Sequence, residues 1–308
     1  MSPSKYLTAS ALMIATGSLG YGKTPTPADE IIVPPSQIVN GAVNGRPMTF
    51  QVRSVGPPNL ILNKQTATAM GWKGSGWFGL FRRSAIIAKN KVTADTKVTR
   101  FSVGARTVQK RIGWTDGVVS PNASAFLGVG GVPQSVIKFQ LRAPVAGERQ
   151  IAFGMRNFGF PGYGAFLTIK GIHPIALFFD NAHDTTIASA AAGVELAKLL
   201  NGSFVGPPTR EVVTLNIARP TRVMKLETPL NLAGLVSVSH ISVRTSDGGD
   251  ASRIPDADAD PAEIIVTAPG KSPVKPSYFL IIGRNDMRNC SSMTVDKAKM
   301  QVRLMCRV

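Results

Sequence analysis

The chain has 308 residues, of which 44% are hydrophobic and 17% charged, so it can bury one large core or two ordinary ones and is not a disordered chain. Lys and Arg number 35 against 18 Asp and Glu, a formal net charge of +17, and 30 Gly and 22 Pro without a period exclude a fibrous protein. Two Cys and three His make a zinc framework unexpected, and we predict no metal and no cofactor.

The N-terminus has the features of an export signal. A short segment with one positive charge is followed by an apolar stretch of small residues. Ser18 and Gly20 have the spacing that signal peptidases favour before a cut, and Thr26 and Ala28 form a second such pair, so the cleavage site stays open. The sequence predicts a signal peptide and N-terminal tail over residues 1–28, and an exported protein that is periplasmic or associated with the cell envelope.

Most of the remaining chain predicts β-structure. Short β-branched or aromatic runs alternate with Gly, Pro and Asn, and the clearest strands are expected at residues 47–52, 136–141 and 165–170. Two helices are expected. One covers residues 64–70 and ends at Gly71, and the other begins at Ser189 and ends before Asn201.

A weak internal duplication organises these elements. In the first copy Pro47 leads into a strand with a charged residue, Arg53, six positions later, and an apolar run and a helix follow. In the second copy Pro174 leads in the same way to Asp180, and again an apolar run and a helix follow. The predicted division falls in a Gly-rich stretch, with an N-terminal lobe over residues 29–160 and a C-terminal lobe over residues 161–308.

This order of features resembles the half-unit of retropepsin-like and pepsin-like aspartic peptidases, with an Asp-Thr-Gly triplet after the first strand and an apolar-apolar-Gly triplet later. Two half-units imply an all-β, bilobed aspartic-peptidase-like β-barrel fold with a few short helices and a cleft between the lobes. Both Asp-Thr-Gly triplets are altered, to Arg53-Ser54-Val55 and Asp180-Asn181-Ala182. The later triplet is expected at Ile281-Ile282-Gly283 and at Val118-Val119-Ser120, where Ser replaces Gly.

The altered triplets change the chemistry that the resemblance implies. Peptide hydrolysis in this family needs two carboxylates that share one proton. A guanidinium at Arg53 facing Asp180 favours the ionised carboxylate and lowers its pKa, so no proton donor is left. We therefore predict a degenerate member that does not cut but binds an extended peptide or an envelope component. Its candidate cleft residues are Arg53, Ser54, Asp180, Asn181 and Ala182.

The alternative is an active acid peptidase that uses Asp180 with a second carboxylate from elsewhere. Asp184 could pair with Asp180 in a tight loop, but an Asp at this place also shapes the turn, and we favour the turn. His183 is expected to be a turn or surface residue and not a base.

Cys290 and Cys306 flank two alternating segments around a polar turn at residues 296–299, which predicts a hairpin. Such a hairpin places the two sulfur atoms on opposite residues, close enough for a disulfide. The alternative, two separate thiols, would apply in a reducing cytosol.

The positive charge is uneven. Residues 1–157 carry 19 Lys and Arg against 5 Asp and Glu, whereas the remaining residues carry 16 against 13. A basic patch at Arg82, Arg83, Lys89 and Lys91 would attract an anionic envelope component, such as lipopolysaccharide or anionic lipid, before nucleic acid. The plain alternative is a solvated hairpin face.

Residues 246–276 interrupt the strand pattern with Gly, Pro and alternating Asp, and predict a mobile insertion. Its Asp256–Asp260 run lacks the Gly and Glu of a calcium loop. Residues 28–33 and 261–268 both contain Glu-Ile-Ile-Val and resemble the TonB-box segments of outer-membrane receptors. A TonB-like partner that binds by strand addition is therefore a further prediction.

Overall fold

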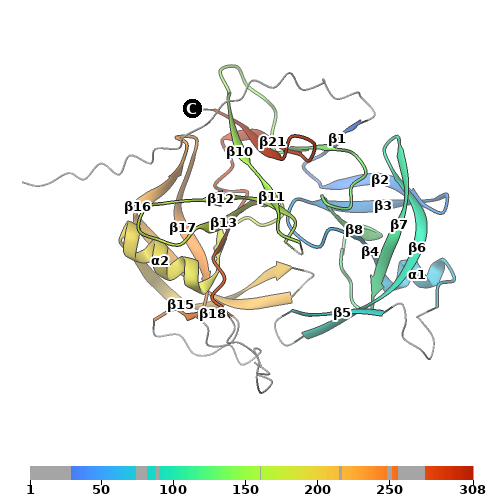
Figure 1. Cartoon of the computed structure of the whole chain (residues 1–308), viewed down its shortest axis with the longest axis horizontal. Coiled ribbons are helices and arrows are strands. Elements are labelled where there is room, and N and C mark those ends of the chain that lie inside the picture. The colour runs from blue at the N-terminus through green and yellow to red at the C-terminus, as the bar shows by residue number, and fades with distance from the viewer. Residues whose placement is uncertain are drawn as a thin grey trace, which may run out of the picture.

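The computed structural model describes residues 29–73, 82–87, 90–159, 161–214, 217–247, 252–255 and 275–307. Over these ranges it consists of β-strands with two short helices (Figure 1). The prediction of an all-β fold of two lobes with few helices is confirmed. Neither helix in these ranges has the length and apolar character needed to cross a membrane.

The first lobe is built on a seven-stranded sheet whose strands have the order β2-β3-β8-β4-β7-β6-β5. A further pairing between β2 and β6 closes six of these strands into a barrel. The bounds in chain order are β2 (Ile38–Val43), β3 (Arg46–Arg53), β4 (Leu60–Asn63), β5 (Arg82–Ile87), β6 (Asn90–Val103), β7 (Arg106–Thr115) and β8 (Ala125–Gly128), with α1 (Lys64–Ala69) after β4.

The second lobe is built on an eight-stranded sheet of order β11-β12-β13-β20-β14-β17-β16-β15. The bounds in chain order are β11 (Arg156–Asn157), β12 (Tyr163–Leu167), β13 (Ile175–Phe179), β14 (Ile187–Ala188), β15 (Gly202–Thr214), β16 (Ile217–Leu232), β17 (Val236–Arg244) and β20 (Phe279–Ile282). The helix α2 (Ala190–Leu200) follows β14, and a small separate sheet pairs β18 (Ser246–Asp247) with β19 (Ser252–Arg253).

The two large sheets repeat one topology. In the first lobe β3 pairs in parallel with β8, β8 is antiparallel to β4, and β4 is parallel to β7. In the second lobe β13, β20, β14 and β17 have the same relations in the same order. The duplication seen in the sequence therefore corresponds to two sheets with equivalent strand neighbours.

This topology corrects one sequence assignment. The strand equivalent to β20 is β8, so the triplet that matches Ile281-Ile282-Gly283 is Phe126-Leu127-Gly128, and Ser120 lies in the preceding loop. Both glycines are needed for close approach. A Cβ on Gly128 would lie 2.1 Å from a backbone carbonyl oxygen of the loop after β3, and one on Gly283 would lie 2.4 Å from backbone atoms of the loop after β13. In both lobes, therefore, an apolar strand ends beside a glycine.

A third, five-stranded sheet joins the two halves of the chain (Figure 1). Its order is β1-β9-β21-β22-β10, with bounds β1 (Glu30–Val33), β9 (Val136–Gln140), β10 (Arg149–Gly154), β21 (Cys290–Asp296) and β22 (Gln301–Cys306). The C-terminal hairpin is thus inserted between strands that precede residue 160. One continuous cluster of buried apolar side chains runs through all three sheets and includes Phe50, Ile137, Leu177, Ile241 and Met293.

The predicted ends of α2 are confirmed, whereas one predicted strand has other bounds. Ser189 begins α2, because its hydroxyl accepts a hydrogen bond from the Ala192 N–H at 3.2 Å, and Asn201 ends the helix in the left-handed region at a φ of 51°. The strand predicted at residues 165–170 begins and ends earlier, at Tyr163 and Leu167, since the chain turns before Gly171.

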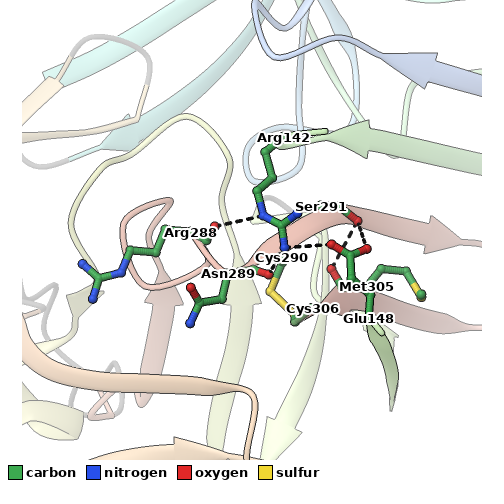
Figure 2. Close-up of a disulfide and its surroundings, with 8 residues drawn as sticks. All are labelled: Arg142, Glu148, Arg288, Asn289, Cys290, Ser291, Met305 and Cys306. Atoms are coloured by element: carbon green, nitrogen blue, oxygen red, sulfur yellow. Dashed lines mark hydrogen bonds and ion pairs between the residues drawn. A yellow bond between two sulfur atoms is a disulfide. The ribbon is translucent and has the colours of Figure 1, made fainter. Parts of the chain in front are cut away.

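The predicted disulfide between Cys290 and Cys306 is present, and the two residues are directly opposite each other on β21 and β22. Figure 2 shows its surroundings. Arg142 contacts Glu148 at 2.7 Å and donates to the backbone oxygens of residues 288 and 289, while the Ser291 hydroxyl donates to Glu148 at 2.5 Å. These contacts fix the start of the hairpin to the connection between β9 and β10.

Several predictions fall outside the described residues. They are the signal peptide over residues 1–28, Lys89, the Asp256–Asp260 run, most of the insertion at 246–276 and the second TonB-like segment at 261–268. Arg82, Arg83 and Lys91 lie on the strands β5 and β6. Residues 30–33 of the first TonB-like segment form the edge strand β1, which pairs in parallel with β9 and buries Ile31 and Val33.

Candidate functional site

The chain brings Arg53 and Asp180 together although 127 residues separate them. Arg53 is the last residue of β3, and Asp180 directly follows β13, the equivalent strand of the second lobe. Arg53 Nη2 lies 3.1 Å from Asp180 Oδ2, with 0% of the Asp180 side chain exposed and 14% of the Arg53 side chain. The equivalent ends of the two repeated strands therefore meet in a buried ion pair.

The other candidate cleft residues surround the same carboxylate. The Ala182 N–H donates to Asp180 Oδ1 at 2.9 Å. The Ser54 hydroxyl lies between two acceptors, 3.2 Å from Asn181 Oδ1 and 3.5 Å from Asp180 Oδ1. Each of the two triplets, Arg53-Ser54-Val55 and Asp180-Asn181-Ala182, thus contributes polar groups to one network that crosses between the lobes.

A second link between the lobes lies beside this network. The Gln37 side chain donates from Nε2 to the backbone oxygen of Asn181 at 2.8 Å, and Gln37 is itself buried. Nearby, the Val55 and Gly162 backbones form an isolated antiparallel bridge, and the Gly56 N–H donates to the oxygen of Pro161 at 3.1 Å. The segment that follows Arg53 is therefore held to the second lobe by backbone as well as by side-chain contacts.

His183 lies in the turn after β13, as predicted, but it is not a surface residue and is part of the site. Its Nδ1 lies 2.5 Å from Asp180 Oδ2 and 3.3 Å from Arg53 Nη2, and its Nε2 lies 2.6 Å from the backbone oxygen of Val212. Only 13% of its side chain is exposed. The spacing of three residues from Asp180 within a turn was the signal in the sequence, because a turn brings such side chains together.

Asp184 does not join the site. Its carboxylate is exposed and pairs with Arg284, 2.5 Å from Oδ1 to Nη2. The interpretation that Asp184 belongs to the loop, and is not a partner of Asp180, agrees with this position.

The electrostatics of the site favour an ionised Asp180. Burial disfavours the charged form and by itself would raise the pKa of Asp180. The Arg53 guanidinium, and after it the hydrogen bond and charge of His183 and the Ala182 N–H, outweigh burial and hold the pKa of Asp180 well below its usual range. The carboxylate is therefore a fixed negative charge at neutral and mildly acidic pH.

The groups bonded to Asp180 limit the reactions that the site can support. They are a guanidinium, an imidazole, a hydroxyl and a backbone N–H, and none of them is a second carboxyl group. Both ring nitrogens of His183 are engaged within the protein, Nδ1 with Asp180 and Arg53 and Nε2 with the backbone oxygen of Val212.

A serine nucleophile is not assembled either. The Ser54 hydroxyl faces Asp180 and Asn181, and no hydrogen bond joins it to His183, which a Ser-His arrangement requires. Over the described ranges, no three His, Cys, Asp or Glu side chains gather in a way that could hold a metal ion.

The sequence matches no protein-family model and no curated protein sequence. Among solved structures, the chain is similar to the crystal structure of aspartic proteinase from Irpex lacteus. The identity is 10%, the TM-score is 0.44, and the match covers 88% of this chain and 94% of that chain.

Proposed function

We propose that this chain is a binding protein built on an aspartic-peptidase-like plan, and that it does not hydrolyse peptide bonds. The observation that carries the proposal is the buried ion pair between Arg53 and Asp180. Arg53 lies at the end of β3, the position at which an acid dyad would need its second carboxylate. Since acid hydrolysis depends on two carboxyl groups with separated titrations, a single carboxylate fixed by Arg53 and His183 lacks the proton donor.

A cleavage assay tests the absence of catalysis. The full chain is incubated with unfolded casein between about pH 3 and 6, beside Asp180→Asn and, as a matched control, Asp184→Asn. Asp184 is an exposed carboxylate four residues away and outside the network. We expect no cleavage by any of the three proteins. Cleavage by the unaltered chain that is lost in Asp180→Asn and kept in Asp184→Asn would establish a peptidase and contradict the proposal.

The proposed ligand is an extended peptide segment held where the lobes meet. The edge strand β15 reaches the site, since the backbone oxygen of Val212 bonds His183 while 42% of the Val212 residue is exposed. β15 is the outermost strand of its sheet, and an extended chain can bind to such an edge by strand addition. The pairing of β15 with β16 shifts register between Val205 and Thr209, where two prolines lie, and again between Val212 and Thr214, so the regular stretch beside the site is Thr209–Val212.

Binding is tested with reduced, carboxymethylated α-lactalbumin as a permanently unfolded probe, by fluorescence anisotropy. We expect saturable binding that Val212→Trp weakens. Val205→Trp is the matched control, because Val205 lies on the same strand with 40% of the residue exposed but on the far side of the register shift. Equal binding by the two variants, or none by the unaltered chain, would remove the support for a ligand at this edge.

We further propose that the protein works outside the cytosol. The disulfide between Cys290 and Cys306 supports this location, since disulfides persist in oxidising compartments. N-terminal sequencing of the protein from fractionated cells tests the proposal. A chain that begins after residue 20 or 28 and is found outside the cytosol is the expected result, and an intact Met1 on a cytosolic protein would overturn it.

A further inference from the structure

A pocket lies in the second lobe, apart from the Asp180 site. Its volume is about 450 Å³, within the range of small-molecule sites. One wall is formed by β17 and the turn before it, and another by residues between 285 and 289, in the connection from β20 to β21. Residues 184–186 and Arg307 also line the pocket. The Asp180 carboxylate does not line this pocket, and neither the ion pair with Arg53 nor the proposed peptide edge contributes a group to it.

Asp286 supplies one carboxylate to the pocket. Its Oδ2 accepts a hydrogen bond from the Thr186 hydroxyl at 2.5 Å, and the same hydroxyl accepts from the Gly283 N–H at 3.0 Å, so the carboxylate is held in one orientation. Partial burial raises the pKa of Asp286, and the hydrogen bond from Thr186 and the charges of Arg288 and His240 oppose the increase only in part. Its second oxygen, Oδ1, makes no hydrogen bond over the described ranges and is available to a ligand.

Two guanidinium groups line the same pocket. They belong to the exposed residues Arg288 and Arg307, and His240 is a further exposed lining residue. Over the described ranges neither guanidinium forms a hydrogen bond or an ion pair, although the charge of Arg288 acts on Asp286. The other acidic lining residue, Asp184, is already paired with Arg284. Figure 2 shows the side chains of Arg288 and Asn289 directed away from the disulfide and from Arg142. The backbone at both residues is fixed, because Arg142 donates to the Arg288 and Asn289 oxygens.

The balance of these groups defines a ligand chemistry. Two unpaired guanidinium groups favour a carboxylate or a phosphate, to which Arg binds with two parallel hydrogen bonds. A single free carboxylate oxygen, with the side chains of Ser237, Ser239 and Asn289, suits hydroxyl groups. A ligand with an ammonium group is disfavoured, because the unpaired charges in the pocket are positive in sum. We infer that this pocket binds a small hydroxylated anion, a sugar acid or a sugar phosphate.

Isothermal titration calorimetry on the full chain at about pH 7 and low salt tests the inference. The probes are D-glucuronate, D-glucose 6-phosphate, neutral D-glucose and inorganic phosphate, each up to about 10 mM. We expect glucuronate or glucose 6-phosphate to bind at least about tenfold more tightly than glucose and than phosphate alone. Whichever of the two anionic sugars binds more tightly shows whether the pocket prefers a carboxylate or a phosphate group on the sugar.

Variants assign the binding to this pocket. Arg288→Ala and Arg307→Ala should each weaken the preferred probe about tenfold or more, the usual effect of losing a charge-assisted hydrogen bond. Asp286→Asn, which keeps the shape of the side chain, should weaken the sugar probe but not inorganic phosphate. Arg149→Ala is the matched control, an exposed arginine on β10 that does not line the pocket. Unchanged thermal unfolding and circular dichroism verify that each variant is folded.

The inference is overturned if no probe binds, if glucose binds as tightly as its anionic derivatives, or if the Arg288 and Arg307 variants bind like the control. It is also overturned if phosphate alone matches glucose 6-phosphate, because the hydroxyl groups would then have no role. None of these results bears on the peptidase assay, since the two experiments use different groups and different probes.

Discussion

Replacing Arg53 with methionine tests the central electrostatic argument. The change keeps most of the length of the side chain and removes the guanidinium that lies 3.1 Å from the fully buried Asp180. Removing one partner of a buried pair typically costs about 3–5 kcal/mol, because the other charge stays buried without compensation. His183 and the Ala182 N–H still contact the carboxylate, so we expect the lower end, a loss of about 3 kcal/mol in the free energy of unfolding.

The measurement is urea unfolding at pH 7, followed by circular dichroism and by tryptophan fluorescence. Arg100→Met is the matched control, because Arg100 is an exposed arginine in the same lobe and should change the free energy of unfolding by less than about 0.5 kcal/mol. Asp180→Asn combined with Arg53→Met should recover part of the loss, since the uncompensated charge is then absent. A value for Arg53→Met equal to that of the control would refute the reasoning.

The pH dependence has a definite sign. The pKa of Asp180 is lower in the folded protein than in the unfolded chain, so its ionisation stabilises the fold above the unfolded value of about 3.9. This contribution is lost as the pH falls from that value toward the folded pKa. In Arg53→Met burial is less opposed, and the pKa of Asp180 rises. The difference in the free energy of unfolding between the unaltered chain and Arg53→Met should therefore be largest near pH 7 and shrink toward pH 3. A difference that stays constant with pH would contradict this prediction.

Three further predictions concern the scaffold. Replacing both Cys290 and Cys306 with serine should lower the free energy of unfolding by about 3 kcal/mol, the usual loss when a disulfide that closes a loop of this length is removed. In urea titrations, dithiothreitol should have no further effect on this double variant. Gly128→Ala should lower the free energy of unfolding by about 3 kcal/mol, because the added Cβ meets a backbone carbonyl. Gly117 has open space around it, so Gly117→Ala should change the free energy of unfolding by less than about 0.5 kcal/mol. Equal effects of the two substitutions would refute the close approach at Gly128. Burial, with the charge of Lys110, lowers the pKa of Lys297 to about 8, so between pH 8 and 10 the unfolded chain binds more protons than the folded protein. The free energy of unfolding of the native protein should therefore rise over this range relative to that of Lys297→Met. Parallel curves of the free energy of unfolding against pH would argue against a buried amine.

Signals that act over a few residues determined the local structure correctly. Ser189 and Asn201 mark the ends of α2, because capping needs only the adjacent backbone. The hairpin that carries Cys290 and Cys306 was also predictable, since alternation around a polar turn fixes which residues are opposite each other. The charged residue six positions after Pro47 and Pro174 indicated that Arg53 and Asp180 are equivalent, and the two side chains do meet.

Contacts between distant strands decided the rest. Only the parallel pairing of β3 with β8 shows that Gly128, and not Ser120, matches Gly283, because both segments have an apolar pair before a small residue. His183 reaches Asp180 through the turn that follows β13 and reaches the Val212 oxygen through β15, and neither distance is fixed by spacing alone. The third sheet likewise combines strands from both ends of the chain.

The sequence by itself determined that this is a β protein with two related halves, in which Arg53 and Asp180 hold equivalent positions. Only the tertiary structure determined which groups surround that acid, and that a separate pocket holds unpaired arginines beside Asp286. The physical reason is the range of the interactions. Caps, turns and alternation are fixed by neighbouring residues, whereas buried ion pairs and pockets depend on the register of strands that are far apart in the chain.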